Sequence, residues 1–178
     1  AALAAAEAVG ANLDAAIMAL AGLSPAEGRG ARSAVRVAGG EATLIDESYN
    51  ANPSSMAAAI GLLGVAPIGA GGRRIAVLGE MLELGPDAPA LHANLAKALV
   101  AAKVDCVYAA GELMRHLWDA LPAAMLGLHA DSAVGLVGPV ADAVAPGDVV
   151  MVKGSNASKV SAVARALNEG GKEKESQA

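Results

Sequence analysis

Residues 46–56 bring polar side chains together in the order D-E-S-Y-N-A-N-P-S-S-M. A mostly apolar run, 42–45, precedes them, and an alanine-rich segment follows. This order predicts a strand, a polar loop and the start of a helix. In open α/β sheets, ligands bind in the crevice outside the carboxyl ends of the strands. Because a loop with carboxylates, a phenol and carboxamides is more polar than a connection needs, it predicts a ligand-binding site.

Individual side chains of this loop suggest different roles. Asp46 could accept hydrogen bonds from both hydroxyls of a nucleotide ribose, or it could cap the turn after the strand. Asn52 directly precedes Pro53, and an Asn N-cap with Pro at the first helical position predicts a structural role. Asn50 has no such local duty. Tyr49 could stack on a base or pack under the loop, and both alternatives stay open.

Polar groups also occur in a linker and after a late strand. Arg29 lies in a stretch that contains Pro25 and two glycines, where its guanidinium could reach a phosphate when two domains close, or remain solvated. Lys153 and Ser155 follow an apolar strand pattern. The ammonium could pair with a carboxylate or phosphate, and the hydroxyl could donate to a ligand or cap a helix.

A third polar segment contains Glu80, Glu83 and His92. Their spacing matches no strong metal motif. We expect the two acids to line a cleft or to hold their own loop, and His92 to be structural. The chain also contains neither G-x-x-x-x-G-K-[ST] nor G-x-G-x-x-G, so the sequence predicts no phosphate-cradling loop.

Composition and charge exclude several classes of protein. The net charge is −5 and there is no basic block, which argues against a nucleic-acid partner. No segment has the roughly 18 consecutive apolar residues of a membrane span, so no membrane insertion is predicted. The single Cys106 cannot form an internal disulfide, which is compatible with the reducing cytosol, and we expect a cytoplasmic protein. The Ala-rich start lacks the form of a signal peptide, and its first residue, Ala1, suggests a chain that begins within a longer protein.

The order of the expected elements indicates an α/β fold. Two short helices in 2–22, with Asn12 as N-cap of the second, precede a linker over 24–30. Strands are expected at 32–37 and 41–45, joined at the pair Gly39-Gly40, and then at 74–78, 104–109, 125–128 and 148–152. Helices are expected at 53–64, 87–102, 111–121, 132–144 and 158–168. Apolar strands that alternate with helices predict a doubly wound, Rossmann-like, mostly parallel sheet. The charged tail from Glu169 is expected to be disordered.

Four segments, in order, resemble the C-terminal domain of the Mur ligases. They are Glu27-Gly28-Arg29, the loop D-E-S-Y-N-A-N-P-S-S-M, the stretch V-L-G-E-M-L-E-L-G with His92 after it, and Val152-Lys153-Gly154-Ser155. The S-Y-N-A-N-P form is most similar to family members that add D-alanyl-D-alanine to UDP-N-acetylmuramoyl-tripeptide. Close relatives continue K-G-S-R-S, whereas this chain has Asn156, so a dipeptide contact by that arginine is in doubt.

The resemblance implies a division of the chain and a set of roles. Residues 1–24 correspond to the last helices of an ATP-binding central domain, 25–31 to a hinge, 32–168 to the C-terminal domain, and 169–178 to a disordered tail. The family forms an amide through an acyl phosphate, with ATP and with Mg²⁺ whose ligands lie mainly in the central domain. The N-terminal and central domains would be partners that this chain lacks, and the fragment would be inactive alone. The nucleotide contacts would be Arg29, Asp46, Tyr49, Asn50 and Asn52, and the contacts near the amine substrate would be Lys153 and Ser155.

Two alternatives to this reading are another amide ligase of the same superfamily and a non-catalytic Rossmann-like binding module. The S-Y-N-A-N-P form argues against the first, because those relatives resemble Y-A-H-x-P or G-A-H-N-P at this site. The lack of a phosphate loop keeps the second open.

Overall fold

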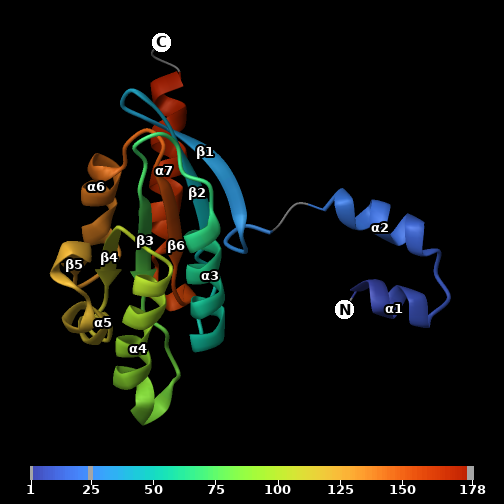
Figure 1. Cartoon of the computed structure of the whole chain (residues 1–178), viewed down its shortest axis with the longest axis horizontal. Coiled ribbons are helices and arrows are strands. Elements are labelled where there is room, and N and C mark those ends of the chain that lie inside the picture. Colours follow the sequence, from blue (N-terminus) through green and yellow to red (C-terminus); the bar gives the residue numbers. More distant parts are fainter. Residues whose placement is uncertain (1, 24–25, 176–178) are drawn as a thin grey trace.

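The computed structural model describes residues 2–23 and 26–175, and Figure 1 shows a sheet body with a pair of helices beside it. The linker residues Ser24 and Pro25, and the last three residues of the expected tail, lie outside the described residues. The helices are α1 (Ala2–Ala8), α2 (Leu13–Ala21), α3 (Pro53–Val65), α4 (Ala88–Ala101), α5 (Met114–Ala120), α6 (Val134–Ala143) and α7 (Ser161–Glu175). The strands are β1 (Ala31–Val37), β2 (Gly40–Glu47), β3 (Arg74–Gly79), β4 (Cys106–Ala110), β5 (Leu126–Ala130) and β6 (Val149–Lys153).

The six strands form one sheet in the order β1-β2-β6-β3-β4-β5. Strand β1 pairs antiparallel with β2 through the hairpin Val37–Gly40, and the other neighbours are parallel. The predicted doubly wound, mostly parallel sheet is therefore confirmed. The chain passes β6 when it crosses from β2 to β3 along the face covered by α3, and it returns from β5 to β6 along the face covered by α6. The direction of the crossovers therefore reverses at β6. Such a reversal opens crevices at the carboxyl ends of the strands.

Two apolar layers cover the two faces of the sheet. One joins residues of α3, α4 and α5 to the strands, with Met56, Leu63 and Leu99 fully buried. The other joins residues of α6 and α7 to the opposite face, with Leu136 and Val163 fully buried. Since no Phe is available, Leu, Val, Ile, Met and Ala fill both layers, and strands buried on both faces read as continuous apolar runs. This explains why I-A-V-L and V-V-M-V are free of alternation.

The end of the chain differs from the prediction. Disorder was expected from Glu169, whereas α7 extends to Glu175 in the structure; a disordered tail stays a prediction. Elongating a helix that is already packed requires one new hydrogen bond per residue, whereas nucleation orders several residues at once. The helix also begins later than the expected residue 158. A 3₁₀ turn, Asn156–Ser158, ends at Lys159 in the left-handed conformation, and α7 begins only after it.

Helices α1 and α2 differ from the rest of the chain because none of their residues is buried. The predicted cap of α2 is confirmed, since the Asn12 side chain accepts from the Ala15 N–H at 2.8 Å. Apolar side chains of α2, including Ile17 and Met18, are nevertheless exposed. An amphipathic helix is normally stabilised by packing its apolar face. Among the described residues, no helix is long and apolar enough to cross a membrane.

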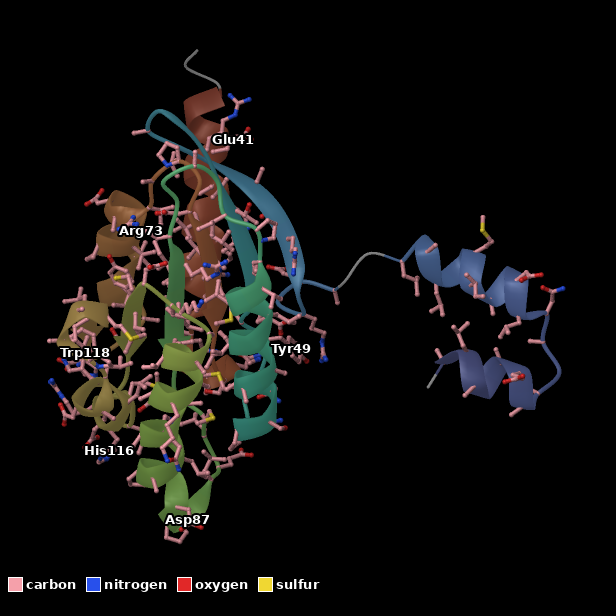
Figure 2. All side chains as sticks on the ribbon, in the orientation of Figure 1. Glu41, Tyr49, Arg73, Asp87, His116 and Trp118 are labelled. Carbon is pink, nitrogen blue, oxygen red and sulfur yellow. The ribbon has the colours of Figure 1, made fainter. Side chains whose placement is uncertain are left out.

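The amino-terminal edge of the sheet is held by Asp148, which is 1% exposed. Its carboxylate accepts from the Arg73 backbone N–H at 2.8 Å, from Arg73 Nη2 at 2.6 Å and from the Ala145 N–H at 2.9 Å. Figure 2 shows Arg73 at this edge, where β3 begins. Burial acts to raise the pKa of Asp148, but the bonds from Arg73 and Ala145 outweigh it and hold the pKa below its ordinary value. The ionised carboxylate therefore joins the loops before β3 and β6.

We expect Asp148→Ala to lower the free energy of unfolding by about 3 kcal/mol, because it leaves the backbone N–H groups of Arg73 and Ala145 without their acceptor. Urea unfolding at pH 7 measures this change. Asp142→Ala, at an exposed position of α6, is the matched control and should change stability by less than about 0.5 kcal/mol. Equal effects of the two substitutions would contradict the role of the buried carboxylate.

Candidate functional site

A cleft of about 270 Å³ opens at the carboxyl end of β2, beside β6. It lies where the order of the strands reverses, at the position expected for ligands in this class of fold. Five of the predicted site residues line it: Arg29, Tyr49, Asn50, Asn52 and Lys153. The remaining lining residues are Gly28, Glu47 and Ser55. Asp46 and Ser155 lie close in sequence to this wall but are not among its lining residues.

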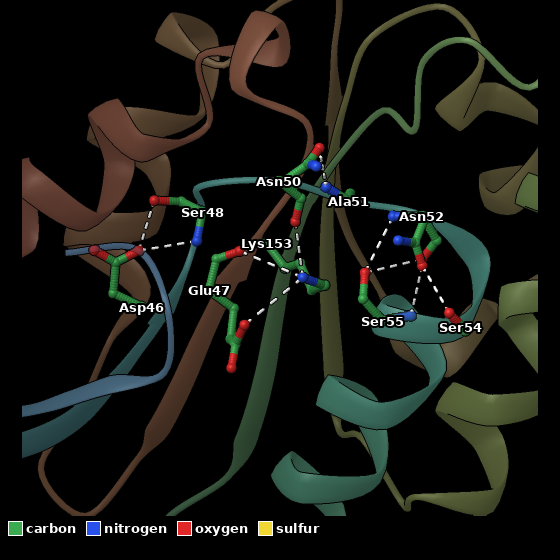
Figure 3. Close-up of polar contacts among 9 residues, drawn as sticks. All are labelled: Asp46, Glu47, Ser48, Asn50, Ala51, Asn52, Ser54, Ser55 and Lys153. Atoms are coloured by element: carbon green, nitrogen blue, oxygen red, sulfur yellow. Dashed lines mark hydrogen bonds and ion pairs between the residues drawn. The ribbon is translucent and has the colours of Figure 1, made fainter. Parts of the chain in front are cut away.

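Asn52 lines the cleft at the start of α3. Its side chain accepts from the Ser55 backbone N–H at 2.9 Å, and the Ser55 hydroxyl accepts from the Asn52 N–H at 3.1 Å. This reciprocal pair is a capping box, and Pro53 follows at the first helical position. The structural role predicted for Asn52 is therefore confirmed, while its side chain also lines the cleft. Figure 3 shows this cap beside the rest of the loop.

Asp46 is engaged within its own turn. Its Oδ1 accepts from the Ser48 backbone N–H at 3.0 Å and from the Ser48 hydroxyl at 2.6 Å (Figure 3). This is the turn-capping alternative that the sequence left open. The residue is 9% exposed, and none of the described residues donates a hydrogen bond to its second carboxylate oxygen. A ribose contact by Asp46 stays a prediction.

Arg29 and Tyr49 lie against each other at the mouth of the cleft. The guanidinium carbon is 4.0 Å from the centroid of the Tyr49 ring, a cation–π contact, and the ring is about half exposed. Figure 2 shows Tyr49 on the side of the sheet body from which the chain continues toward α2. Gly28 makes this approach possible: its φ is +71°, and a Cβ there would lie 2.9 Å from the Tyr49 nitrogen.

Lys153 occupies the inner wall and is only 2% exposed. Its Nζ donates to the Asn50 carbonyl oxygen at 2.9 Å and lies 3.7 Å from Glu47 Oε2 (Figure 3). Burial lowers the pKa of Lys153, and the neighbouring Glu47 acts in the opposite direction. Glu47 was not among the residues that the sequence predicted for the site. Its pairing with Lys153 follows from the parallel register of β2 and β6, which sequence patterns alone do not provide.

Ser155 lies behind this wall, where β6 ends. Its backbone N–H donates to the Glu80 carbonyl at 2.9 Å, and the residue is 6% exposed. The hydroxyl caps no helix, and its oxygen has no hydrogen-bond partner among the described residues. A buried hydroxyl without a partner is costly and marks a place where a ligand or water can bind. Gly154 permits the close approach of this segment to the end of β3, since a Cβ there would lie 2.9 Å from Gly79 Cα.

The loop after β3 is held by Glu80 and His92. Glu80 Oε1 accepts from the Leu113 N–H at 2.8 Å, so the acid holds the start of α5 and also lines a second cleft of about 280 Å³. His92 is fully buried; its Nε2 accepts from the Met81 N–H at 3.0 Å, while Nδ1 lies 2.7 Å from the Ala88 carbonyl. Only the tautomer with hydrogen on Nδ1 satisfies both contacts. The structural role predicted for His92 is confirmed.

The cleft therefore combines the Arg29 cation, which comes from the stretch before β1, with an aromatic ring and carboxamides of the loop after β2. These groups can neutralise a phosphate, stack on a base and hydrogen-bond to a heterocycle. Metal chemistry has no comparable support: within residues 2–23 and 26–175, no three His, Cys, Asp or Glu side chains lie together as metal ligands.

Comparison with known proteins gives the cleft a family context. The family described as "Mur ligase, glutamate ligase domain" matches residues 31–156. A UDP-N-acetylmuramoyl-tripeptide–D-alanyl-D-alanine ligase of Escherichia coli is 35% identical over 92% of this chain and 34% of its own length. The enzyme with the same name from Mycobacterium tuberculosis is 36% identical over 76% of the chain and 30% of its own length. The chain thus spans about a third of the length of these relatives.

Solved structures give the same result for the fold. A MurF ligase from Thermotoga maritima in complex with ADP superposes with a TM-score of 0.77 at 25% identity, over 97% of this chain and 37% of its own. A MurF from Acinetobacter baumannii superposes with a TM-score of 0.76 at 24% identity, over 94% of this chain and 35% of its own. Because the Acinetobacter baumannii structure is only 24% identical to this chain, its similarity concerns the fold alone.

We expect the loop after β3 to loosen in acid. Burial lowers the pKa of His92 below its ordinary value of 6.5; contact with the Ala88 carbonyl and Glu80 opposes this shift, and His116 adds to it. The folded state thus favours neutral His92, whose contribution to stability is complete above about pH 6.5 and is lost as the pH falls through the lower folded pKa. Hydrogen exchange of the Met81 amide across this range measures the loss. His116→Gln, which replaces an exposed histidine, should leave the acid-induced loss of protection unchanged. His92→Gln should abolish the pH dependence of this loss.

The cap of α3 gives a second prediction for the site. Asn52→Ala should lower the free energy of unfolding of the sheet body by about 1 kcal/mol, because the Ser55 N–H loses its acceptor. Asn12→Ala removes the equivalent cap of α2, a helix with no buried residue, and should leave the main unfolding transition unchanged. Circular dichroism in urea compares the two variants, and an equal loss in both would refute the assignment.

Proposed function

This chain belongs to the Mur ligase family, and from that membership we propose that it is the C-terminal part of a ligase for D-alanyl-D-alanine. The whole enzyme would join the dipeptide to UDP-N-acetylmuramoyl-tripeptide in the synthesis of peptidoglycan precursors. It would transfer the γ-phosphoryl group of ATP to the tripeptide carboxylate. The dipeptide amine would then attack the acyl carbon, and phosphate would leave. The observation that carries this proposal is the polar cleft at the end of β2, in a domain of this family.

We assign ATP to the cleft at the carboxyl end of β2. The exposed Tyr49 ring supplies a surface on which a base can stack, and the Arg29 guanidinium supplies a cation for a phosphate. The Asn50 side-chain oxygen accepts from the Ala51 N–H at 2.8 Å, which leaves the amide NH₂ available to a ligand. Asp46, through its second oxygen, and Asn52 complete the proposed set. The ADP bound by the Thermotoga maritima relative supports a nucleotide as the ligand class.

The amine substrate is assigned to the region around Ser155. The unpartnered, buried hydroxyl supports this assignment, because a bound carboxylate or amide would satisfy it. The sequence pattern also put Lys153 near the dipeptide, but its ammonium is engaged with the nucleotide-side loop.

The remaining parts of the reaction would lie in the rest of the enzyme. The described residues offer no cluster of metal ligands, so we assign the Mg²⁺ that accompanies ATP, and the site for the UDP moiety, to the N-terminal and central domains. We assign α1 and α2 to the end of the central domain, where their exposed apolar side chains would be covered. Catalysis by this part would consist of positioning and charge neutralisation. We place the enzyme in the cytoplasm.

The test is ligation by the full reading frame that contains this chain. We expect release of one phosphate per amide formed with D-alanyl-D-alanine, and no ATP turnover by the 178-residue chain alone. Asn50→Ala should raise the KM for ATP about tenfold, the factor that one lost hydrogen bond of about 1.4 kcal/mol gives, and leave the KM for the dipeptide unchanged. The exposed Asn94, on α4, provides the control Asn94→Ala. ATP turnover by the isolated chain, or ligation of another amine only, would refute the proposal, and nucleotide binding without ligation would favour a binding module.

A further inference from the structure

The Lys153 ammonium is directed toward Glu47 and Asn50, and not toward the region assigned to the amine substrate. An ammonium has three donors, and among the described residues all contacts of Nζ are with the last residue of β2 and the loop that follows it. They are the Asn50 carbonyl at 2.9 Å, the Glu47 carbonyl at 3.5 Å and Glu47 Oε2 at 3.7 Å. Figure 3 shows the ammonium between these acceptors. A ligand carboxylate would have to displace Glu47 from a side chain that is 3% exposed.

These contacts determine the shape of the loop. The two carbonyls belong to Glu47, the last residue of β2, and to Asn50, so a single buried group fixes both ends of the turn that contains Ser48 and Tyr49. Buried carbonyls without a donor are unfavourable, and a charged donor makes the stronger bond. Because the Asn50 carbonyl is directed inward to Lys153, the loop presents the Tyr49 ring and the Asn50 amide at the cleft.

The position of Lys153 in the sheet makes it a rigid support. It is the last residue of β6, which is buried along its whole length and pairs with Glu47 of β2 on one side and Leu78 of β3 on the other. The charged groups that face the ammonium in this cleft are Glu47 and, at the mouth, Arg29. Glu47 is the acid that compensates the burial of the ammonium, and burial of an unpaired charge is unfavourable.

We propose that Lys153 is a positioning residue for the nucleotide cleft: its ammonium holds residues 47–50 in the conformation that presents Tyr49 and Asn50, and it does not contact the amine substrate. The inference rests on the proposed function for the identity of the two ligands. The conformation of the loop itself can be tested without either ligand.

The first arm of the test is amide hydrogen exchange in this chain. Lys153→Met keeps most of the apolar stem and removes the donor. We expect exchange of the amides in 48–52 to become about tenfold faster, as loss of a charge-assisted hydrogen bond predicts, while the loop after β3 is unchanged. Lys97→Met, which removes an exposed lysine of α4, should have no effect on either loop. Unchanged exchange in 48–52 would overturn the proposal.

The second arm separates positioning from direct contact. In NMR titrations, Lys153→Met should weaken the response of 47–52 to ADP about tenfold and leave the response to D-alanyl-D-alanine within twofold of the wild type. A lost dipeptide response would overturn the proposal. If neither ligand perturbs the wild-type chain, the ligand assignment fails for the isolated chain, and the exchange arm decides the role of Lys153.

If Lys153→Met does not fold, an NMR measurement on the wild-type chain still tests the proposal. The ¹³Cε resonance of Lys153 reports directly on the ammonium. We expect no shift with D-alanyl-D-alanine, because the group stays bonded to the loop. A dipeptide-dependent shift of this resonance that exceeds the shifts of the Asn50 and Ala51 amides would overturn the proposal.

Discussion

Parallel pairing of β2 and β6 places Glu47 opposite Lys153, and the shape of the cleft depends on that register. A shift by one residue would send alternate side chains to the other face of the sheet and separate the acid from the ammonium. The register is secured by burial, since β6 is covered on both faces and every one of its five residues is buried. An apolar strand in the middle of the sheet thus determines where a polar site can form.

Charged side chains hold the loops at both edges of the sheet, and in each case they act on the backbone. At the amino-terminal edge, Asp148 accepts from the N–H groups of Arg73 and Ala145. At the carboxyl-terminal edge, Lys153 donates to carbonyls of the loop after β2, and Glu80 accepts from the Leu113 N–H. Loops lack the repeating hydrogen bonds of helices and sheets, so buried ionic groups supply the missing partners. The loop after β2 is therefore ordered by the same means as the loops at the amino-terminal edge.

The sequence predicted those features that depend on local chemistry. The capping role of Asn52, the Val37–Gly40 hairpin and the alternation of apolar strands with helices each follow from residue type and spacing within one segment. Features that depend on contacts between segments were missed or left open. Glu47 was not assigned to the site because its partner is 106 residues away in the chain. The helical continuation to Glu175 was missed because composition alone does not show that α7 is already packed upstream.

The stretch from Gly28 to Gly30 is joined to the sheet body by backbone hydrogen bonds. The Tyr49 N–H donates to the Gly28 carbonyl at 3.1 Å, and the Gly30 N–H donates to the Asp46 carbonyl at 2.7 Å. These bonds extend the β1–β2 ladder past its last strand pair, and the Arg29–Tyr49 contact adds to them. The backbone on both sides of Arg29 is therefore bonded to the sheet body, and the guanidinium lies at the cleft through contacts that do not involve α1 or α2. For the nucleotide that we propose, a guanidinium held in this way would reduce the order that has to be created on binding.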